Sequence, residues 1–323
     1  MKTALLINRD NFEQHSGWED TGWELIHMGN GVPDPQKVIA TGAAVLVVDA
    51  MMKIGPDIIE NMPGLKLIHS QGVGFNAIDI DSARNAGVYV CNNAGVNARP
   101  VAEHAVLLIL ALLKSFRYNE DMVYAGKQMD AKIAGFRDGL PELYGLKVGL
   151  VGLGAISKAL ASLLKPFGCD VCYYTRSGDR GVPELTYMPL DKLLAVSDIV
   201  SLHVPVTPET ENMINAETLK LFKRGAILIN TARGEIMDHE AVAQALKSGQ
   251  LGGFGADTLA PEPFLPDNPL ICSLSEELRR RVALSPHIAG ITSGTFVRVY
   301  ERIRKNIEAI ECGERPDCIV NGM

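Results

Sequence analysis

Residues 148–157 read VGLVGLGAIS, an apolar run that enters a glycine turn and continues into a helix-forming segment. The run predicts a buried strand, and residues 157–164 predict a helix after the turn. Gly152 allows a tight turn, and Gly154 lets the backbone approach a pyrophosphate whose charge then lies at the helix N-terminus. A glycine turn alone is a weak signal. Its position between a strand and a helix predicts a dinucleotide site.

Two departures from the usual dinucleotide pattern follow this turn. Ser157 takes the place of the third glycine, where a small side chain still lets the helix pack closely on the strand. About twenty residues on, where a carboxylate usually binds the adenosine ribose, the segment 173–177 has none. Thr175, Arg176 and Ser177 instead offer a guanidinium and two hydroxyls, which suit a 2'-phosphate. The segment favours NADP(H), and NAD(H) with a surface arginine is the alternative.

Short apolar runs alternate with helical patterns along the chain, which is the rhythm of βαβ units. The predicted strands are 4–7, 44–48, 65–69 and 88–91, then 147–151, 171–174, 199–202, 226–230, 253–256 and 282–284. A long helix is predicted from Ala98 to about Tyr124, and an amphipathic helix over 294–312. A length of 323 residues is typical of two domains. The sequence therefore predicts an α/β protein with two doubly wound parallel sheets.

Composition excludes several classes of function. The net charge is -7 and basic residues are scattered, so no nucleic-acid surface is expected. The longest apolar run, residues 105–113, is far shorter than the roughly 18 residues that span a membrane. Six cysteines and a first apolar stretch too short for an export signal predict reduced thiols in the cytoplasm. Cys169 and Cys172 have CxxC spacing but no second ligand pair, so no metal site is expected.

Polar residues with catalytic potential follow three predicted strands of the second series. Arg233 can bind a substrate carboxylate and polarise a neighbouring carbonyl, which favours hydride transfer. His287 is the natural general acid, because its ordinary pKa is about 6.5. Glu262 is the carboxylate expected to orient that ring. Each of the three has a plain structural explanation when taken alone, but the ordered set after a dinucleotide turn predicts an oxidoreductase.

These motifs together resemble the D-isomer-specific 2-hydroxyacid dehydrogenases over nearly the whole chain. The motifs that carry the resemblance are Gly72-Val73-Gly74, Asn97, Val101-Ala102-Glu103, the glycine turn, His203-Val204-Pro205 with Thr207 and Thr210, Thr231-Ala232-Arg233-Gly234, Asp257 with Glu262, and Pro286-His287. The resemblance implies hydride transfer between a nicotinamide cofactor and a small D-2-hydroxy acid or 2-keto acid. It also implies that Arg233, Glu262 and His287 form the catalytic set.

The resemblance assigns further roles to residues of this chain. Cofactor contacts are predicted at Gly152 and Gly154 of the glycine turn and at Ala232. The resemblance implies further contacts at Ala155, Ile156, Thr175, Val204, Pro205, Thr210, Thr231 and Asp257, the last near the nicotinamide amide. The backbone of Val73 and Gly74 would face the substrate carboxylate. Residues 1–98 with 289–323 would form a flavodoxin-like substrate domain, and 99–288 the Rossmann cofactor domain. The family also implies a homodimer formed through the cofactor domains and the arm 116–144.

The departures from the family are Ser157, Thr175-Arg176, Thr258-Leu259 where a Val-Phe pair is usual, and extra residues around 275–281. Glu262 argues against the formate dehydrogenases, which have Gln at this place. Two alternatives stay open. A phosphoglycerate dehydrogenase-like enzyme is disfavoured by Asp49, because those enzymes tend to have a basic residue in this loop. A dinucleotide-sensing corepressor that shares the fold can keep the catalytic set. Glyoxylate or hydroxypyruvate is the favoured substrate, followed by a larger aliphatic 2-keto acid, and Met51 and Met52 are candidate pocket residues.

Overall fold

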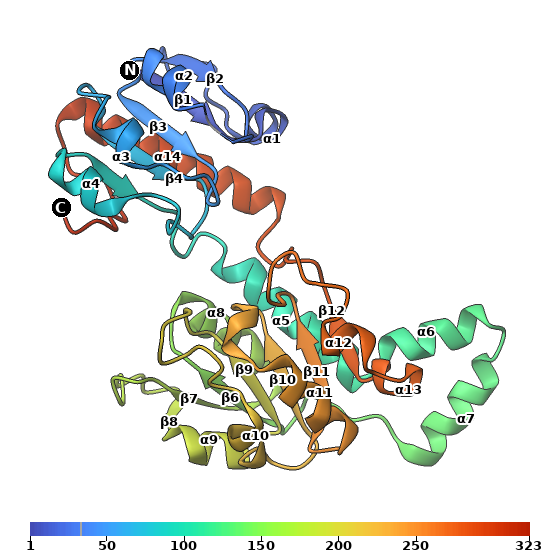
Figure 1. Cartoon of the computed structure of the whole chain (residues 1–323). Helices are drawn as coiled ribbons and strands as arrows, with labels where there is room; N and C mark the ends of the chain where they lie inside the picture. Colours follow the sequence, from blue (N-terminus) through green and yellow to red (C-terminus); the bar gives the residue numbers. More distant parts are fainter. Residues whose placement is uncertain (33) are drawn as a thin grey trace. The chain divides into compact units, whose positions relative to one another are not determined.

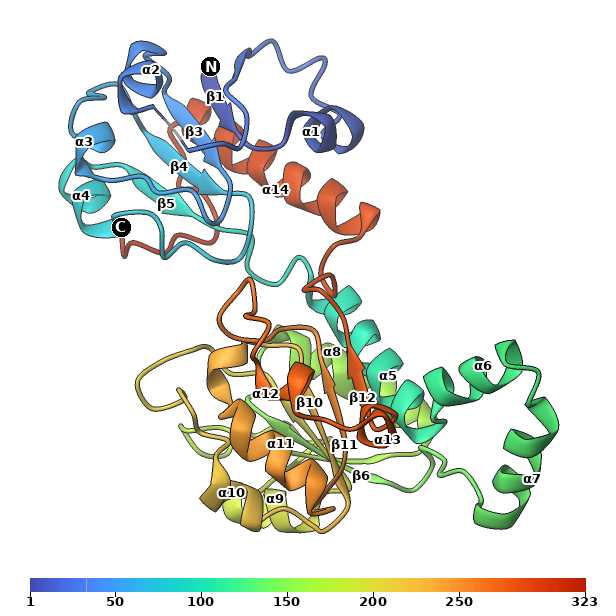
Figure 2. The same ribbon diagram turned by 45° about the vertical axis from the view of Figure 1, so that its right-hand side comes forward.

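The protein is described by a computed structural model over residues 1–32 and 34–323. It divides into two compact units, Met1–Asn97 with Ile291–Met323, and Ala98–Gly290. Each unit contains a parallel sheet with helices on both faces (Figure 1 and Figure 2), which confirms the predicted fold class. Within the described ranges, no helix combines the length and the apolar character needed to cross a membrane.

The first unit has a five-stranded parallel sheet in the order β2-β1-β3-β4-β5, which is the flavodoxin-like order. Its strands are β1 (Lys2–Leu6), β2 (Glu24–His27), β3 (Val45–Val48), β4 (Leu67–Ser70) and β5 (Tyr89–Cys91). Its helices are α1 (Arg9–His15), α2 (Pro35–Ala40), α3 (Pro56–Ile59), α4 (Ile80–Asn85) and α14 (Ser293–Cys312). The sequence prediction misses β2, because this edge strand has no fully buried residue and therefore no continuous apolar run.

Helices cover both faces of the first sheet. One face is covered by α1 and α14, whose buried side chains include Phe12, Tyr300 and Ile303. The other face is covered by α2, α3 and α4 through residues such as Val38 and Ile58. The predicted amphipathic helix near the C-terminus is confirmed as α14, and its apolar stripe is part of the core of this unit.

The second unit has a seven-stranded parallel sheet in the order β12-β11-β10-β9-β6-β7-β8, an extended Rossmann order. Its strands are β6 (Lys147–Val151), β7 (Asp170–Tyr174), β8 (Thr186–Tyr187), β9 (Ile199–Leu202), β10 (Ala226–Asn230), β11 (Leu251–Ala256) and β12 (Val282–Leu284). The six predicted strands are confirmed. The seventh, β8, escapes prediction because it is a two-residue edge strand with an exposed residue and a half-buried one.

Nine α-helices and two short 3-10 turns belong to the described part of the second unit. They are α5 (Ala98–Leu113), α6 (Phe116–Tyr124), α7 (Gln128–Asp138), α8 (Ala155–Leu164), η1 (Lys165–Phe167), α9 (Leu190–Val196), α10 (Ala216–Lys220), η2 (Gly234–Ile236), α11 (His239–Lys247), α12 (Pro269–Cys272) and α13 (Glu276–Arg279). Helices α5 and α8 pack on one face of the sheet. Helices α9, α10 and α11 pack on the other face.

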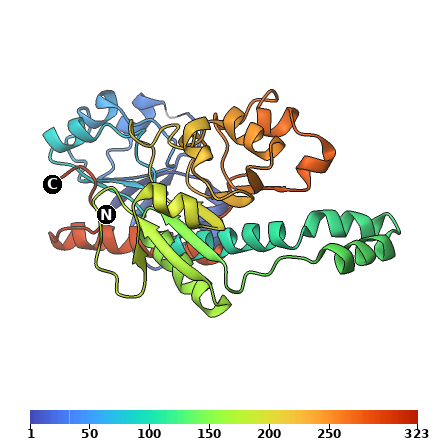
Figure 3. The same cartoon turned by 90° about the horizontal axis from the view of Figure 1, so that it is seen from below.

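The prediction of one helix from Ala98 to Tyr124 is wrong. Helix α5 ends at Leu113, and Ser115 has a φ of 46°, in the left-handed region, before α6 begins. Ser115 is neither Gly nor Pro, so no breaker residue marked this end. The side chain of Asn119 donates to the carbonyl of Lys114 at 2.8 Å, which satisfies one acceptor freed by the break. The turn lets α6 and α7 extend away from the sheet as an arm (Figure 3).

Candidate active site

The glycine turn lies where β6 meets α8, as predicted. Gly152 has a φ of +99°, and a Cβ atom there would lie 2.5 Å from the carbonyl oxygen of His203, so no other residue fits. Gly154 is the N-cap of α8, which has no side-chain hydrogen bond to its first amides. These uncapped N–H groups and the helix dipole suit a pyrophosphate. The residues present therefore fit the dinucleotide that the motif predicts.

Ser157 has a specific structural task at this turn. Its side chain is fully buried, and its hydroxyl donates to the carbonyl of Gly152 at 2.8 Å. The residue that replaces the third glycine therefore fastens the helix to the turn instead of disturbing it. Because Gly154 acts as the N-cap, α8 begins at Ala155, two residues before the predicted start at Ser157.

The loop after β7 exposes a guanidinium and has no free carboxylate. Arg176 is largely exposed and lies 3.4 Å from the carboxylate of Glu209. The hydroxyl of Thr175 donates to the carbonyl of Gly178 at 2.6 Å. The nearby acid Asp179 accepts from the Tyr173 hydroxyl and the Gly181 amide, so its carboxylate closes the loop on itself.

The other predicted cofactor residues follow β9, β10 and β11, at the same edge of the sheet. The hydroxyl hydrogen of Thr210 is used within the protein, since it is donated to the Pro205 carbonyl at 2.6 Å. The buried hydroxyl of Thr231 has no partner among the described residues. A buried hydroxyl without a partner is costly unless a ligand satisfies it. Thr231 thus adds a second observation that fits a cofactor at this edge.

Arg233 follows β10 and projects an exposed side chain. Its backbone carbonyl accepts from the Asn230 side chain at 2.8 Å, which fixes the turn. Its guanidinium contacts only the carbonyl of Ala232 among its hydrogen-bond partners in the described structure, at 2.8 Å. A Cβ on Gly234 would lie 2.2 Å from the amide nitrogen of Ala260, so this glycine lets the two loops touch. The fork of Arg233 remains available for a carboxylate.

Glu262 and His287 form a close pair in the loops after β11 and β12. The Nδ1 atom of His287 lies 2.7 Å and 2.9 Å from the two carboxylate oxygens of Glu262. Because an ionised carboxylate only accepts, Nδ1 carries the proton and Nε2 is left to exchange one. The side chain of His287 is 39% exposed and that of Glu262 is 52% exposed, so this ion pair adds little to the stability of the fold. Its geometry instead suits acid–base chemistry.

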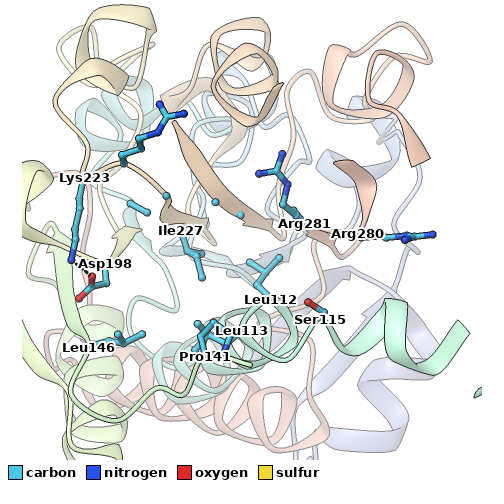
Figure 4. Close-up of a pocket in the computed structure, with 15 residues that line it drawn as sticks. Leu112, Leu113, Ser115, Pro141, Leu146, Asp198, Lys223, Ile227, Arg280 and Arg281 are labelled. Atoms are coloured by element: carbon cyan, nitrogen blue, oxygen red, sulfur yellow. Dashed lines mark hydrogen bonds and ion pairs between the residues drawn. The ribbon is translucent and has the colours of Figure 1, made fainter. Parts of the chain in front are cut away.

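Strand order brings the three catalytic candidates to one edge of the sheet. Arg233, Glu262 and His287 follow β10, β11 and β12, which are neighbours in the sheet. The carboxyl ends of parallel strands are where ligands bind in such folds. The cavity drawn in Figure 4, about 380 Å³, lies instead by the first residues of β10 and near Gly252 and Gly253. That cavity is therefore at the opposite edge from the chemistry.

In the first unit, every carbonyl of residues 70–74, at the end of β4, accepts a hydrogen bond from a residue of the same unit. Asn93 donates from its side chain to the carbonyls of residues 70 and 71 and from its backbone amide to that of residue 72. The Asn92 side chain donates to the Val73 carbonyl at 2.7 Å, and the Ser70 hydroxyl donates to the Gly74 carbonyl at 2.6 Å. The amides of Val73 and Gly74 have no acceptor among the described residues. The sequence pointed to Val73 and Gly74 but missed Asn92 and Asn93, which hold the loop.

The two methionines considered as pocket residues lie in different environments. Met52 is buried in the core of the first unit, so it does not line an open site. Met51 is 85% exposed and remains available. The neighbouring Asp49 accepts from the Met51 amide at 2.9 Å, which closes the loop after β3.

The sequence also missed two partners of Asp257. This carboxylate is 2% exposed and accepts from the Ser285 hydroxyl at 2.6 Å. Nε2 of His104 lies 2.7 Å from that same hydroxyl. The available signal was His104 itself, a polar residue just before an apolar helical run.

Known proteins share both the sequence and the fold of this chain. A family model described as D-isomer specific 2-hydroxyacid dehydrogenase, NAD binding domain, matches residues 106–289. The glyoxylate reductase of Thermofilum pendens is 39% identical over 273 residues, which are 83% of this chain and 78% of that protein. The glyoxylate reductase of Korarchaeum cryptofilum is 34% identical and covers 99% of this chain and 96% of its own length.

Solved structures agree with these sequence matches. The structure of D-2-hydroxyisocaproate dehydrogenase has a TM-score of 0.87 at 28% identity and covers 100% of both chains. An NAD-complexed D-isomer specific 2-hydroxyacid dehydrogenase from Lactobacillus delbrueckii ssp. bulgaricus has a TM-score of 0.81 at 27% identity. It covers 99% of this chain and 100% of its own.

Proposed function

The chain belongs to the D-isomer-specific 2-hydroxyacid dehydrogenase family, and from that premise we propose that it reduces a small 2-keto acid, glyoxylate or hydroxypyruvate first. The family predicted from the motifs is confirmed, and with it a nicotinamide-dependent oxidoreductase of hydroxy and keto acids. The observation that carries the proposal is the Glu262–His287 pair, which lies in the loops after β11 and β12, while Arg233 follows the neighbouring strand β10. Glyoxylate is favoured because the relatives named above are glyoxylate reductases.

Each side chain has a task in this mechanism. A bound reduced nicotinamide supplies the hydride to the keto carbon. Arg233 binds the substrate carboxylate and polarises the keto oxygen with its fork of N–H groups. His287 gives the Nε2 proton to that oxygen in reduction and takes it back in oxidation. Glu262 holds the ring by Nδ1 and stabilises its charged form.

We assign cofactor binding to the second unit, and an anion-binding role to the amides of Val73 and Gly74 in the first unit. The hydrogen bonds of residues 70–74 support this assignment, because all of the carbonyls already have donors within the unit and the amides of Val73 and Gly74 are left to meet an anion. The pyrophosphate is assigned to the amides after Gly154, and the nicotinamide amide to Asp257. The six cysteines are all free thiols, which supports the cytoplasm as the location.

A panel of 2-keto acids tests the proposed activity. Glyoxylate, hydroxypyruvate, pyruvate and 2-ketoisocaproate would each be offered with NADPH and with NADH, and oxidation of the cofactor followed by its absorbance. Turnover is expected to be highest with the two smallest polar acids. Faster turnover with 2-ketoisocaproate would move the substrate to the larger aliphatic class. If the protein bound the cofactor but turned over none of these acids, the proposed enzyme activity would be wrong and a dinucleotide-sensing binding function would be supported instead.

The loop after β7 is proposed to select NADP(H). Changing Thr175 to Asp together with Arg176 to Ala is expected to shift the ratio of kcat/KM values toward NADH by at least about tenfold, since one charge-assisted contact is worth about 1.5–3 kcal/mol. The removed guanidinium no longer meets a 2'-phosphate, and the new carboxylate accepts from a ribose hydroxyl.

Binding of fragments gives the same test without turnover. Isothermal titration with 2',5'-ADP and with 5'-AMP would show whether the wild-type preference follows the extra phosphate. The control is Arg180→Ala, which removes a guanidinium from the same loop. An unchanged ratio in the double variant, or an equal shift in the control, would disprove the assignment to Thr175 and Arg176.

We further propose that the protein is a homodimer joined through the arm of α6 and α7. No described residue of either helix is buried, and the large aromatic side chains of Phe136 and Tyr124 are 81% and 85% exposed. Large apolar side chains of this kind mark a surface that another chain covers. The Arg280 guanidinium, which directly follows α13 in the extra residues 275–281, lies 4.2 Å from the ring centre of Tyr118 in α6, so this segment contacts the base of the arm.

Charges on the arm test the dimer. The double variant Ile133→Glu and Phe136→Glu is expected to sediment as a monomer, because two carboxylates cannot be buried in an apolar contact. Lys127→Glu changes the net charge by the same amount at the N-cap of the same helix, α7, and is expected to leave the dimer intact. If the double variant were still a dimer, the contact between subunits would lie elsewhere. If the wild-type protein were a monomer, the proposed dimer would be wrong.

A further inference from the structure

Three side chains link helix α5 to the loop that carries His287. We propose that His104 is a positioning residue, which acts through Ser285 and Asp257 to hold His287 in its working position. The inference rests on the proposed role of His287 as the acid–base residue. It adds to that role a support that begins on a different element, seven residues into α5.

The backbone of His287 needs such a support. Its φ is +56°, in the left-handed region that residues with a side chain rarely adopt. A conformation of this kind persists only where the surroundings hold it in place. The amide of His287 donates to the carbonyl of Asp257 at 2.7 Å. The next two amides, of Ile288 and Ala289, donate to the two carboxylate oxygens of Asp257 at 2.9 Å and 2.8 Å.

Asp257 can act as this clamp only if its carboxylate keeps its orientation. The side chain is buried, and one of its oxygens also accepts from the Ser285 hydroxyl at 2.6 Å. Ser285 is itself fixed by its amide, which donates to the carbonyl of Ala256 at 3.0 Å. One carboxylate oxygen thus receives an amide and a hydroxyl, and the other receives an amide.

His104 sets the direction in which the Ser285 hydroxyl donates. Its Nε2 atom lies 2.7 Å from the Ser285 oxygen. A serine hydroxyl has one hydrogen, and Ser285 donates it to Asp257 in a hydrogen bond. The Nε2 atom of His104 must therefore carry a hydrogen and donate to the serine oxygen. His104 is also 3.7 Å from the Asp257 carboxylate, and no other basic group of the described chain lies within 4.0 Å of it.

The loss of the Nε2 donor has a specific consequence. Without it the serine oxygen lacks one partner, and the nearest potential counter-charge of a buried carboxylate is removed. The three amide contacts to Asp257 then hold His287 less firmly. A displacement of about 1 Å at a reacting group lowers turnover by up to about 100-fold. The glycine turn lies at a different strand, β6, so binding of the adenosine and pyrophosphate is expected to be unchanged.

The test compares four variants of the full-length enzyme: His104→Leu, His104→Gln, Ser285→Ala and the Leu–Ala double variant. His104→Leu is expected to lower kcat about tenfold, with the dissociation constant of ADP-ribose, which lacks nicotinamide, within about twofold of wild type. His104→Gln is expected to restore most of kcat, because its amide offers an N–H donor in place of Nε2. Ser285→Ala is expected to match His104→Leu. The double variant is expected to be no slower than either single change, since both break one chain of contacts.

Other results would overturn the inference. These are an unchanged kcat in His104→Leu, a Gln variant no better than the Leu variant, or losses that multiply in the double variant. Weak binding of ADP-ribose in the Leu and Gln variants alike would show a general structural role instead. If His104→Leu does not fold, Ser285→Ala decides by the same criteria. The acid–base role of His287 fails separately, if turnover survives in His287→Ala, and the proposed function fails if no 2-keto acid of the panel is turned over.

Discussion

Replacement of His287 by Ala is expected to lower kcat by about three orders of magnitude, the upper part of the range for a general acid–base group. The Nδ1 atom of His287 lies 2.7 Å and 2.9 Å from the carboxylate oxygens of Glu262, so the proposed proton donor has a fixed orientation. Cofactor affinity is expected to stay within about twofold, because His287 follows β12 whereas the glycine turn follows β6. Steady-state oxidation of the reduced cofactor and a fluorescence titration measure the two quantities.

Glu262→Gln is the matched variant for this prediction. The Gln side chain keeps an oxygen that accepts from Nδ1 but removes the charge that stabilises the imidazolium. Its kcat is therefore expected to lie between wild type and His287→Ala. Turnover near the wild-type value in His287→Ala would remove His287 from the chemistry. A Gln variant as slow as His287→Ala would mean that the charge of Glu262 matters as much as the ring itself.

Arg233→Lys is expected to lower kcat/KM for the keto acid by about 10³-fold. A lysine keeps the positive charge but cannot make the parallel pair of hydrogen bonds that a guanidinium makes to a carboxylate. Loss of one preorganised donor to a developing oxyanion alone costs about 10²–10³ in turnover. The Arg233 guanidinium binds no acidic side chain in the described structure, so its removal is not expected to loosen the fold.

Chemical rescue distinguishes a catalytic role of Arg233 from a structural one. Arg233→Ala should regain part of its activity when guanidinium ion is added, because the freed space can hold the ion beside the substrate. Arg224→Ala, an exposed arginine at the opposite edge of the sheet, serves as the control. Arg233→Lys with kcat/KM close to wild type, or no difference between the two alanine variants, would contradict the assigned role.

The parts of the fold that were predictable are those whose signal is local. The buried strands appeared as apolar runs, the helix α14 as a stripe of period 3.6, and the glycine turn as a motif with its strand and helix on either side. The edge strands β2 and β8 were missed because a strand with one open side buries too little to leave an apolar run. The end of α5 was missed because Ser115 adopts a left-handed turn that its residue type does not announce.

The sequence by itself determined the order of the candidate site: a glycine turn followed by Arg233, Glu262 and His287, each after a strand. Only the tertiary structure decided which side chains contact and support these candidates. His104 meets Ser285 across 181 positions of sequence, and Ser285 meets Asp257 across 28. Such contacts depend on which strands become neighbours and where α5 packs, and these are properties of the whole packed sheet. A local pattern records the burial of a residue, whereas its hydrogen-bond partners are set by the packing of distant segments.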